Sequence, residues 1–263
     1  LYRASAVSAM RFAGIDLGSR TIKLVIVDES GEIVEACQVA SGFDALATAK
    51  ELIKDRNYDQ IMATGYGRGL FEVAYDAPTV TEIKAHAVGA RHFFPHGLTV
   101  LDIGGQDSKA MSLTKEGKVK KFEMNDRCAA GTGKFLEIMA KTLGYEIEEF
   151  GPAAEVSREE LAISSMCTVF AESEVTSLIA KGEKREKIAR GIHLSVVNRA
   201  SGMLNRVSAE GTIVFTGGVA KNGCICRMLS SKLGRDILVP DDPQIVGALG
   251  AALILRAQRK SSS

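Results

Sequence analysis

Tryptophan is absent from this sequence of 263 residues, and aromatic residues of all kinds make up only 6% of it. Long apolar runs are also missing, since no stretch approaches the roughly 20 residues that a helix needs to cross a bilayer. Neither sign of charge dominates: 33 basic and 32 acidic residues give a net charge of +1. These absences argue against a membrane protein and against nucleic-acid binding through bulk charge, and we expect a cytoplasmic protein.

A disulfide framework is not favoured either, because the cysteines are odd in number and the chain shows no secretory features. Each cysteine is therefore a buried small residue, a reactive thiol or a metal ligand. The five are Cys37, Cys128, Cys167, Cys224 and Cys226. Residues 1–10 lack the apolar core of a signal peptide, and we expect them to be a tag or a frayed tail.

A strand–loop–strand pattern occurs twice in the sequence. An apolar run ends at Asp16 before a Gly-Ser loop, and a second run ends at Asp102 before a Gly-Gly loop. Four matched pairs recur at a constant offset of 86 residues: Asp16 and Asp102, Gly18 and Gly104, Lys23 and Lys109, and Gly31 and Gly117. This repeat predicts two lobes, residues 11–95 and 96–263, with a final helix that could pack back on the first lobe.

Helical periodicity dominates the second half of the chain. We expect helices over Cys128–Leu143 and Cys167–Lys181, and a long one marked by apolar residues every fourth position from Ile188 to Leu204. A strand over Thr212–Phe215 then leads into Thr216-Gly217-Gly218, and a helix of small residues follows from Val246. The mixture of strands and helices indicates an α/β protein.

The repeated loops have the composition of phosphate-binding loops. Backbone N–H groups can approach an anion where side chains are small, and each loop begins with a carboxylate that could hold Mg²⁺ through water. Thr216-Gly217-Gly218 would allow a flat adenine to approach the backbone. The alternative is that all three are turns that need glycine. Neither a Walker P-loop nor a Rossmann glycine motif is present.

Four segments resemble motifs of the acetate kinase/sugar kinase/actin superfamily: DLGSRTIK (16–23), DIGGQDSK (102–109), TGGVAKN (216–222) and PQIVGALGAA (243–252). The resemblance implies duplicated actin/hexokinase-like (ribonuclease H-like) lobes, with mixed sheets flanked by helices and ATP or ADP with Mg²⁺ in a cleft between the lobes. The expected catalytic residues are Asp16 and Asp102, whose carboxylates would lie on the Mg²⁺ side of the nucleotide. Gln106 or Asp107 would orient the attacking water. Expected nucleotide contacts are Gly18, Ser19, Arg20, Thr21, Lys23, Gly104, Gly105, Gln106, Gly217, Gly218, Ala220, Asn222 and Gln244.

Cys128 and Cys167 both lie at predicted helix starts. A helix N-terminus lowers the pKa of a thiol and favours the thiolate, which is the form that binds metal. The alternative is a pair of packed, inert thiols, since free cysteine is often buried. Two thiols are too few for a [4Fe–4S] cluster, but a twofold-symmetric dimer would supply four.

The two cysteine segments, NDRCAAGTGKFLEIMA (125–140) and AISSMCTVFAESEV (162–175), together with ATGYGR (63–68), resemble the activator ATPases of 2-hydroxyacyl-CoA dehydratases. These belong to the BadF/BadG/BcrA/BcrD ATPase family, which includes reductases for benzoyl-CoA reductase and double-cubane-cluster proteins. The resemblance implies a homodimer with one [4Fe–4S] cluster bridged by Cys128 and Cys167 of both subunits. It also implies ferredoxin or flavodoxin as electron donor, and a partner iron–sulfur dehydratase or reductase.

Two other functions fit parts of the pattern. One is a small-molecule kinase of the same superfamily with structural cysteines, and the other is a regulatory ATPase without redox chemistry. We expect Cys37, Cys224 and Cys226 to be structural. The four histidines show no metal-ligand spacing.

Overall fold

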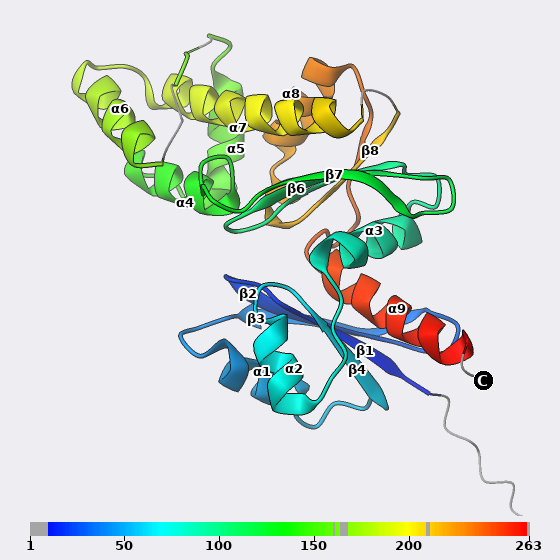
Figure 1. Cartoon of the computed structure of the whole chain (residues 1–263). Coiled ribbons are helices and arrows are strands. Elements are labelled where there is room, and N and C mark those ends of the chain that lie inside the picture. Colours follow the sequence, from blue (N-terminus) through cyan, green and yellow to red (C-terminus); the bar gives the residue numbers. More distant parts are fainter. Residues whose placement is uncertain (1–9, 160, 164–167, 209–210, 262–263) are drawn as a thin grey trace, which may run out of the picture. The chain divides into compact units, whose positions relative to one another are not determined.

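The computed structural model describes residues 10–159, 161–163, 168–208 and 211–261 (Figure 1). The chain forms two compact units, one made of residues up to Gly89 and from Ile245 onward, the other of Ala90–Gln244. Helix α3 (Glu82–Phe93) crosses the boundary between them in the sequence. Across these described ranges, no helix combines the length and the apolar character that a membrane span requires.

A mixed sheet of order β3-β2-β1-β4 forms the centre of the first unit. Its strands are β1 (Phe12–Leu17), β2 (Thr21–Val27), β3 (Ile33–Ala40) and β4 (Gln60–Thr64). Strand β1 pairs antiparallel with β2 and parallel with β4, and all six of its residues are buried. Its near-continuous apolar sequence suits a strand that is covered on both faces.

Three helices cover this first sheet: α1 (Ala45–Ile53), α2 (Arg68–Tyr75) and α9 (Val246–Ser261). In Figure 1, α9 runs along one face, while α1 and α2 lie on the other. The approach of α9 to β1 is very close, because a Cβ built on Gly14 would lie 2.0 Å from the carbonyl oxygen of Ala248. Glycine is therefore required at this position of β1.

The second unit is built on a sheet of order β7-β6-β5-β8-β9. Its strands are β5 (Thr99–Ile103), β6 (Ser108–Leu113), β7 (Val119–Asn125), β8 (Ile213–Thr216) and β9 (Ile237–Leu238). Its helices are α4 (Gly133–Thr142), α5 (Ile147–Val156), α6 (Thr168–Ala180), α7 (Arg185–Val207), the 3₁₀ turn η1 (Gly218–Lys221) and α8 (Gly223–Leu233). Helix α7 packs on β6 and β7 and brings its apolar face into the core of this unit (Figure 1).

The predicted duplication is confirmed at the level of strand register. Asp16 lies opposite Lys23 in the first sheet, and Asp102 lies opposite Lys109 in the second. The bulges also correspond: the pairing shifts at Val27 in β2 and at Leu113 in β6, again 86 residues apart. Two halves with the same pairing and the same irregularity are one supersecondary unit used twice.

The structure corrects the predicted start of the helix after Cys128. Helix α4 begins at Gly133, so Cys128 lies in the preceding loop and not at a helix N-terminus. Gly131 has a φ of +87° and Thr132 has extended backbone, and neither conformation continues a helix. The expected influence of a helix N-terminus on this thiol therefore does not apply.

Helices α2 and α5 are not predicted from the sequence. Gly151-Pro152 lies inside α5, where proline removes a helical hydrogen bond. Capping offsets this loss, because the side chains of Glu146 and Glu149 each accept from the other's backbone N–H. Burial of Phe150 and Ala154 holds the helix against the core.

Candidate functional site: two matched carboxylate loops

Asp16, the last residue but one of β1, lies at the centre of the first candidate site. Its Oδ2 lies 3.5 Å from Nζ of Lys23, on the neighbouring strand. Gly65 follows β4 with a φ of +92°, and a Cβ built on it would lie 2.4 Å from Oδ1 of Asp16. The glycine therefore lets the loop after β4 close over the carboxylate, and a larger residue would displace it.

The loop from Gly18 to Thr21 is anchored by its carbonyl oxygens. The hydroxyl of Ser41 donates to the carbonyl of Gly18 at 2.7 Å, and the N–H of Ser41 donates to that of Arg20 at 2.9 Å. Ser19 and Arg20 are exposed at the tip. An anion-binding loop needs its N–H groups for the ligand, so anchoring through carbonyl oxygens suits this task.

Asp102 occupies the matching position in the second unit and is more deeply buried. Lys109 is equally buried, with its Nζ 3.4 Å from Oδ2 of Asp102 and 2.7 Å from Oδ2 of Asp107. The hydroxyl of Thr216 donates to Oδ1 of Asp102 at 2.9 Å. Both carboxylate oxygens thus have partners, as a buried charge requires.

A second repeat, which the sequence analysis missed, supplies the third strand of each site. Thr64 pairs in parallel register with Asp16, and Thr216 pairs with Asp102. Each threonine precedes a glycine of positive φ, Gly65 or Gly217, that lies against the carboxylate. The feature of the sequence that could have revealed this repeat is a Thr-Gly pair directly after a short apolar strand. Its offset of 152 residues differs from that of the first repeat.

His86 also reaches the first site, although no role for it is predicted from the sequence. A Cβ built on Gly247, in α9, would lie 2.9 Å from Nε2 of His86 and 3.4 Å from Oδ2 of Asp16. His86 is buried on α3. The imidazole and the carboxylate therefore share the space that Gly247 leaves open.

The predicted water-orienting candidates differ in their surroundings. Gln106 is exposed at the tip of the second loop. Asp107 is bound to Lys109, and its backbone carbonyl accepts from the N–H of Gly104 at 3.0 Å. Asp107 therefore stabilises the loop, which leaves Gln106 as the better candidate for contact with water.

The predicted adenosine-binding segment, residues 216–222, lies beside Gln244. Gly217 has a φ of +85°, and its N–H donates to the carbonyl of Pro243. A Cβ built on Gly218 would lie 3.5 Å from Nε2 of Gln244. Ala220 lies buried in η1, and Asn222 caps α8 by accepting from the N–H of Ile225 at 3.1 Å.

The second loop is joined directly to the segment that carries Cys128. At the start of α4, Gly133 and Lys134 donate their N–H groups to the carbonyls of Gly104 and Gly105, at 2.9 and 2.8 Å. The buried hydroxyl of Thr132 lies 3.1 Å from the carbonyl of Gly105 and 2.6 Å from that of Ala129. The candidate phosphate loop and the cysteine segment are therefore hydrogen-bonded neighbours within one unit.

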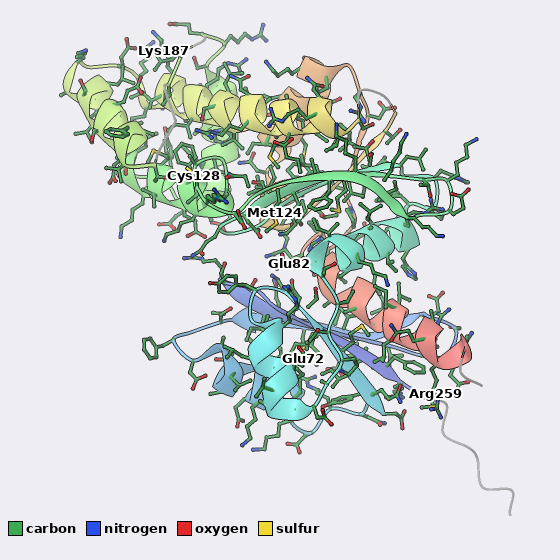
Figure 2. The ribbon with its side chains drawn as sticks, in the orientation of Figure 1. Glu72, Glu82, Met124, Cys128, Lys187 and Arg259 are labelled. Atoms are coloured by element: carbon green, nitrogen blue, oxygen red, sulfur yellow. The ribbon has the colours of Figure 1, made fainter. Side chains whose placement is uncertain are left out.

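Cys128 is half-buried, close to the end of β7 (Figure 2). Its carbonyl accepts from Nδ2 of Asn125 at 3.0 Å, which holds the loop to the last residue of that strand. Cys167 lies outside the described residues. Within the described part of the chain, no group of three or more His, Cys, Asp or Glu side chains could hold a metal ion.

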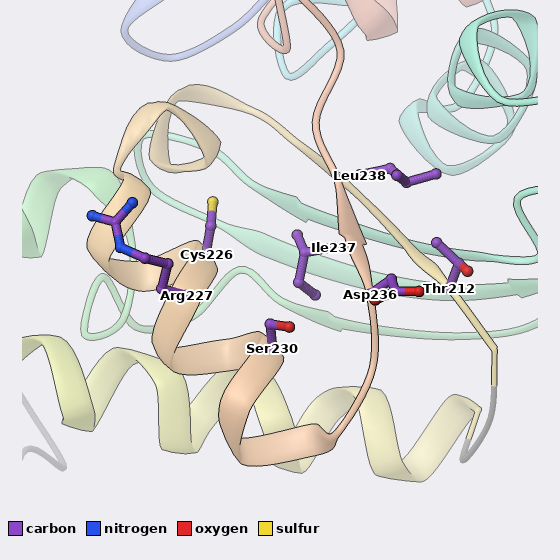
Figure 3. A pocket seen from close by; sticks show the side chains of 7 residues that line it. All are labelled: Thr212, Cys226, Arg227, Ser230, Asp236, Ile237 and Leu238. Atoms are coloured by element: carbon purple, nitrogen blue, oxygen red, sulfur yellow. The ribbon is translucent and has the colours of Figure 1, made fainter.

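The remaining cysteines have the surroundings of structural thiols. Burial raises the pKa of Cys224 to about 11, and it also raises the pKa values of Cys226 and Cys37. Such thiols stay protonated at neutral pH and are poor metal ligands. A surface pocket of about 450 Å³ lies beside Cys226 (Figure 3). Its lining, which includes none of the predicted site residues, is Thr212, Cys226, Arg227, Ser230, Asp236, Ile237 and Leu238.

Known proteins of similar sequence support the family resemblance. The model of the BadF/BadG/BcrA/BcrD ATPase family matches residues 13–254. The activator of lactoyl-CoA dehydratase from Anaerotignum propionicum is 44% identical over 248 residues, covering 91% of this chain and 95% of that protein.

Known structures support the fold. The activator of the 2-hydroxyisocaproyl-CoA dehydratase from Clostridium difficile, with bound ADPNP, has a TM-score of 0.86 at 38% identity, covering 96% of this chain and 97% of that one. A ROK family glucokinase from Streptomyces griseus, in complex with glucose and AMPPNP, has a TM-score of 0.54 at 13% identity over 93% of this chain and 98% of that one, which shows the fold alone. The predicted actin/hexokinase-like fold is confirmed, and the chain belongs to the BadF/BadG/BcrA/BcrD ATPase family.

Proposed function

We propose that this protein is an ATP-dependent activator that delivers single electrons to a partner iron–sulfur enzyme. Membership of an ATPase family and the similarity to a dehydratase activator support ATP hydrolysis in the service of a partner. The partner would be a 2-hydroxyacyl-CoA dehydratase, a related reductase or a double-cubane protein. Ferredoxin or flavodoxin would supply the electrons, in the cytoplasm.

The observation that carries this proposal is the hydrogen bonding between the second carboxylate loop and the start of α4. A phosphate bound at Gly104 and Gly105 would act on the carbonyls that hold Thr132, Gly133 and Lys134. Cys128 precedes this anchor by only four residues. The state of the nucleotide can therefore reach the cysteine segment through short, direct contacts.

In this proposal, Asp16 and Asp102 hold Mg²⁺ through water, and the loops that follow them bind the phosphates. Mg²⁺ usually keeps several of its waters, so a carboxylate near the metal need not bind it directly. Gln106 would orient the water that attacks the terminal phosphate, giving ADP and phosphate. Gly217, Gly218 and Gln244 would bind the adenosine part.

The residues around Cys128 fit an iron–sulfur ligand. Cys128 is half-buried, and it is followed by the small residues Ala129, Ala130 and Gly131, whose side chains are too small to crowd a bulky cluster. Cys128 and Cys167 of two copies would hold one [4Fe–4S] cluster in a homodimer. When bound there, the cluster would allow single electrons to pass from the donor to the partner enzyme.

Anaerobic purification tests the proposal. We expect a brown homodimer with about two iron atoms per chain and a broad absorption band in the blue part of the visible range. Cys128→Ala and Cys167→Ala should each lose iron while keeping ATP binding. Cys226→Ala is the matched control, because Cys226 is a protonated structural thiol, and it should keep its iron.

Other outcomes would favour the rival functions. Protein that stays colourless after anaerobic reconstitution but hydrolyses ATP would overturn the redox role and support a regulatory ATPase. Transfer of phosphate from ATP to a small molecule would support the kinase. Loss of both iron and ATP binding in Cys128→Ala would mean that this cysteine is mainly structural.

A further inference from the structure

His193 is completely buried in the middle of α7, and the proposed function gives it no role. Its Nδ1 lies 2.8 Å from the carbonyl oxygen of Ala189, one turn earlier in the helix. Its Nε2 lies 3.0 Å from Nδ2 of Asn222, the last residue of the predicted adenosine segment. The imidazole thus connects α7 to that segment.

The surrounding hydrogen bonds fix the proton of His193. The side-chain oxygen of Asn222 accepts from the N–H of Ile225, so the amide nitrogen of Asn222 faces the imidazole and donates. Nε2 of His193 must therefore be the acceptor, and Nδ1 carries the hydrogen that is donated to Ala189. Only the neutral imidazole with its proton on Nδ1 satisfies all three contacts.

Helix α5 encloses Asn222 from another direction. A Cβ built on Gly151 would lie 2.8 Å from the side-chain oxygen of Asn222, so only glycine leaves room for the amide. The neighbouring ring of Phe150 packs against the imidazole, with centroids 4.7 Å apart. Asn222 is therefore held by α5 and α7 as well as by its own cap of α8.

We propose that His193 is a positioning residue that holds the adenosine segment, residues 216–222, in its binding conformation through the amide of Asn222. This inference rests on the proposed nucleotide function. Asn222 ends η1, and its backbone N–H donates to the carbonyl of Val219, so a displacement of Asn222 moves the turn that begins at Gly218. His193 itself does not touch the nucleotide.

Three substitutions test this role. His193→Phe keeps a ring but loses the acceptor, and Asn222→Ser keeps an N-cap for α8 but is too short to donate to His193. Each should raise the Kd and the KM for ATP by about tenfold, the effect of one hydrogen bond, with kcat nearly unchanged. His193→Gln should restore most of the affinity, because its amide can accept from Asn222 and donate to Ala189.

The controls separate positioning from general damage. Ser195→Ala removes a buried hydroxyl of the same helix that donates to the carbonyl of Ile192, and it should leave the Kd for ATP unchanged. The double variant of His193→Phe and Asn222→Ser should bind ATP about as well as either single variant, since both remove the same contact. Additive losses, or no rescue by His193→Gln, would overturn the positioning role. If the unaltered protein did not bind ATP, the proposed function would fail as well, whereas ATP binding that is insensitive to His193 would overturn this inference alone.

Discussion

Thr216 donates a hydrogen bond of 2.9 Å to the buried carboxylate of Asp102, whereas the hydroxyl of Thr64, at the same place beside Asp16, is buried and has no hydrogen-bond partner among the residues that the structure describes. The two threonines share their strand register but not their hydrogen bonding.

We expect the two threonines to respond differently to the same substitution. Thr216→Val should lower the free energy of unfolding by about 1–3 kcal/mol, because it leaves a buried carboxylate oxygen without its donor. Thr64→Val should cost much less, since its hydroxyl makes no bond to lose. Urea unfolding of both variants measures the difference. Equal losses of unfolding free energy in the two variants would show that the shape of the new side chain, and not the lost hydrogen bond, determines the effect.

The two lysines of the repeat should also differ. Lys109→Met removes the ammonium group that pairs with the buried Asp102 and with Asp107, and we expect a loss of about 3–5 kcal/mol in unfolding free energy. Lys23→Met should cost less, because the side chain of Lys23 is more exposed, at 14% against 2%. Thermal and urea unfolding would check this order, and a larger loss for Lys23→Met would contradict it.

Gly14 and Gly69 form a matched pair for backbone packing. Gly14→Ala would force its Cβ into the carbonyl of Ala248, and we expect the first unit to unfold or its final helix to detach. Gly69→Ala places its Cβ in open space on α2, and it should raise the free energy of unfolding by about 0.5–1 kcal/mol. Circular dichroism and protease resistance would distinguish the two, and a native-like Gly14→Ala variant would contradict the close approach of α9.

Because His193 is buried, we expect the folded protein to lose stability in acid. Burial lowers its pKa from 6.5 to about 4, while Glu155 on α5 is the charged residue that acts on it in the opposite direction. The unfolded chain binds a proton as pH falls through 6.5, but the folded protein does so only near pH 4. The contribution of His193 is therefore complete above pH 6.5 and is lost toward pH 4, by about 3 kcal/mol in total.

The comparison with His193→Phe isolates this effect from other titrating groups. The variant should be less stable at pH 7.5, but its stability should depend less on pH between 6.5 and 4. Urea unfolding at a series of pH values provides the measurement. Parallel curves for the two proteins would show that His193 is not kept neutral by folding.

Gln106 should affect catalysis without affecting the fold. Because its side chain is exposed at the tip of the second loop, Gln106→Ala should leave thermal stability unchanged. If it orients the attacking water, kcat for ATP hydrolysis should fall by roughly 10- to 100-fold, with little change in KM. An unchanged kcat would exclude that role.

The strand–loop–strand repeat could be predicted because Asp16, Lys23 and their counterparts keep one offset in the sequence. A constant offset leads to the same register, and the structure has it in both sheets. The Thr64–Thr216 match was missed because the segment between β6 and β8 is much longer than the one between β2 and β4. Its offset therefore differs, although the spatial relationship is the same.

The loop around Cys128 and helix α5 show where sequence periodicity fails. The apolar spacing after Cys128 is helical, but the backbone of Gly131 and Thr132 leaves the helical region and delays the start of α4. In α5, the turn-forming pair Gly151-Pro152 is overridden by burial and capping. Tertiary contacts decide both cases, and Gly151 is also needed to accommodate Asn222.

The hydroxyl of Thr132 carries a single hydrogen and faces two carbonyl oxygens, those of Gly105 and Ala129. At any moment it can serve one of them fully, so the two loops compete for one donor. One side chain thus links the loop after Asp102 to the segment that carries Cys128, without any contribution from a helix.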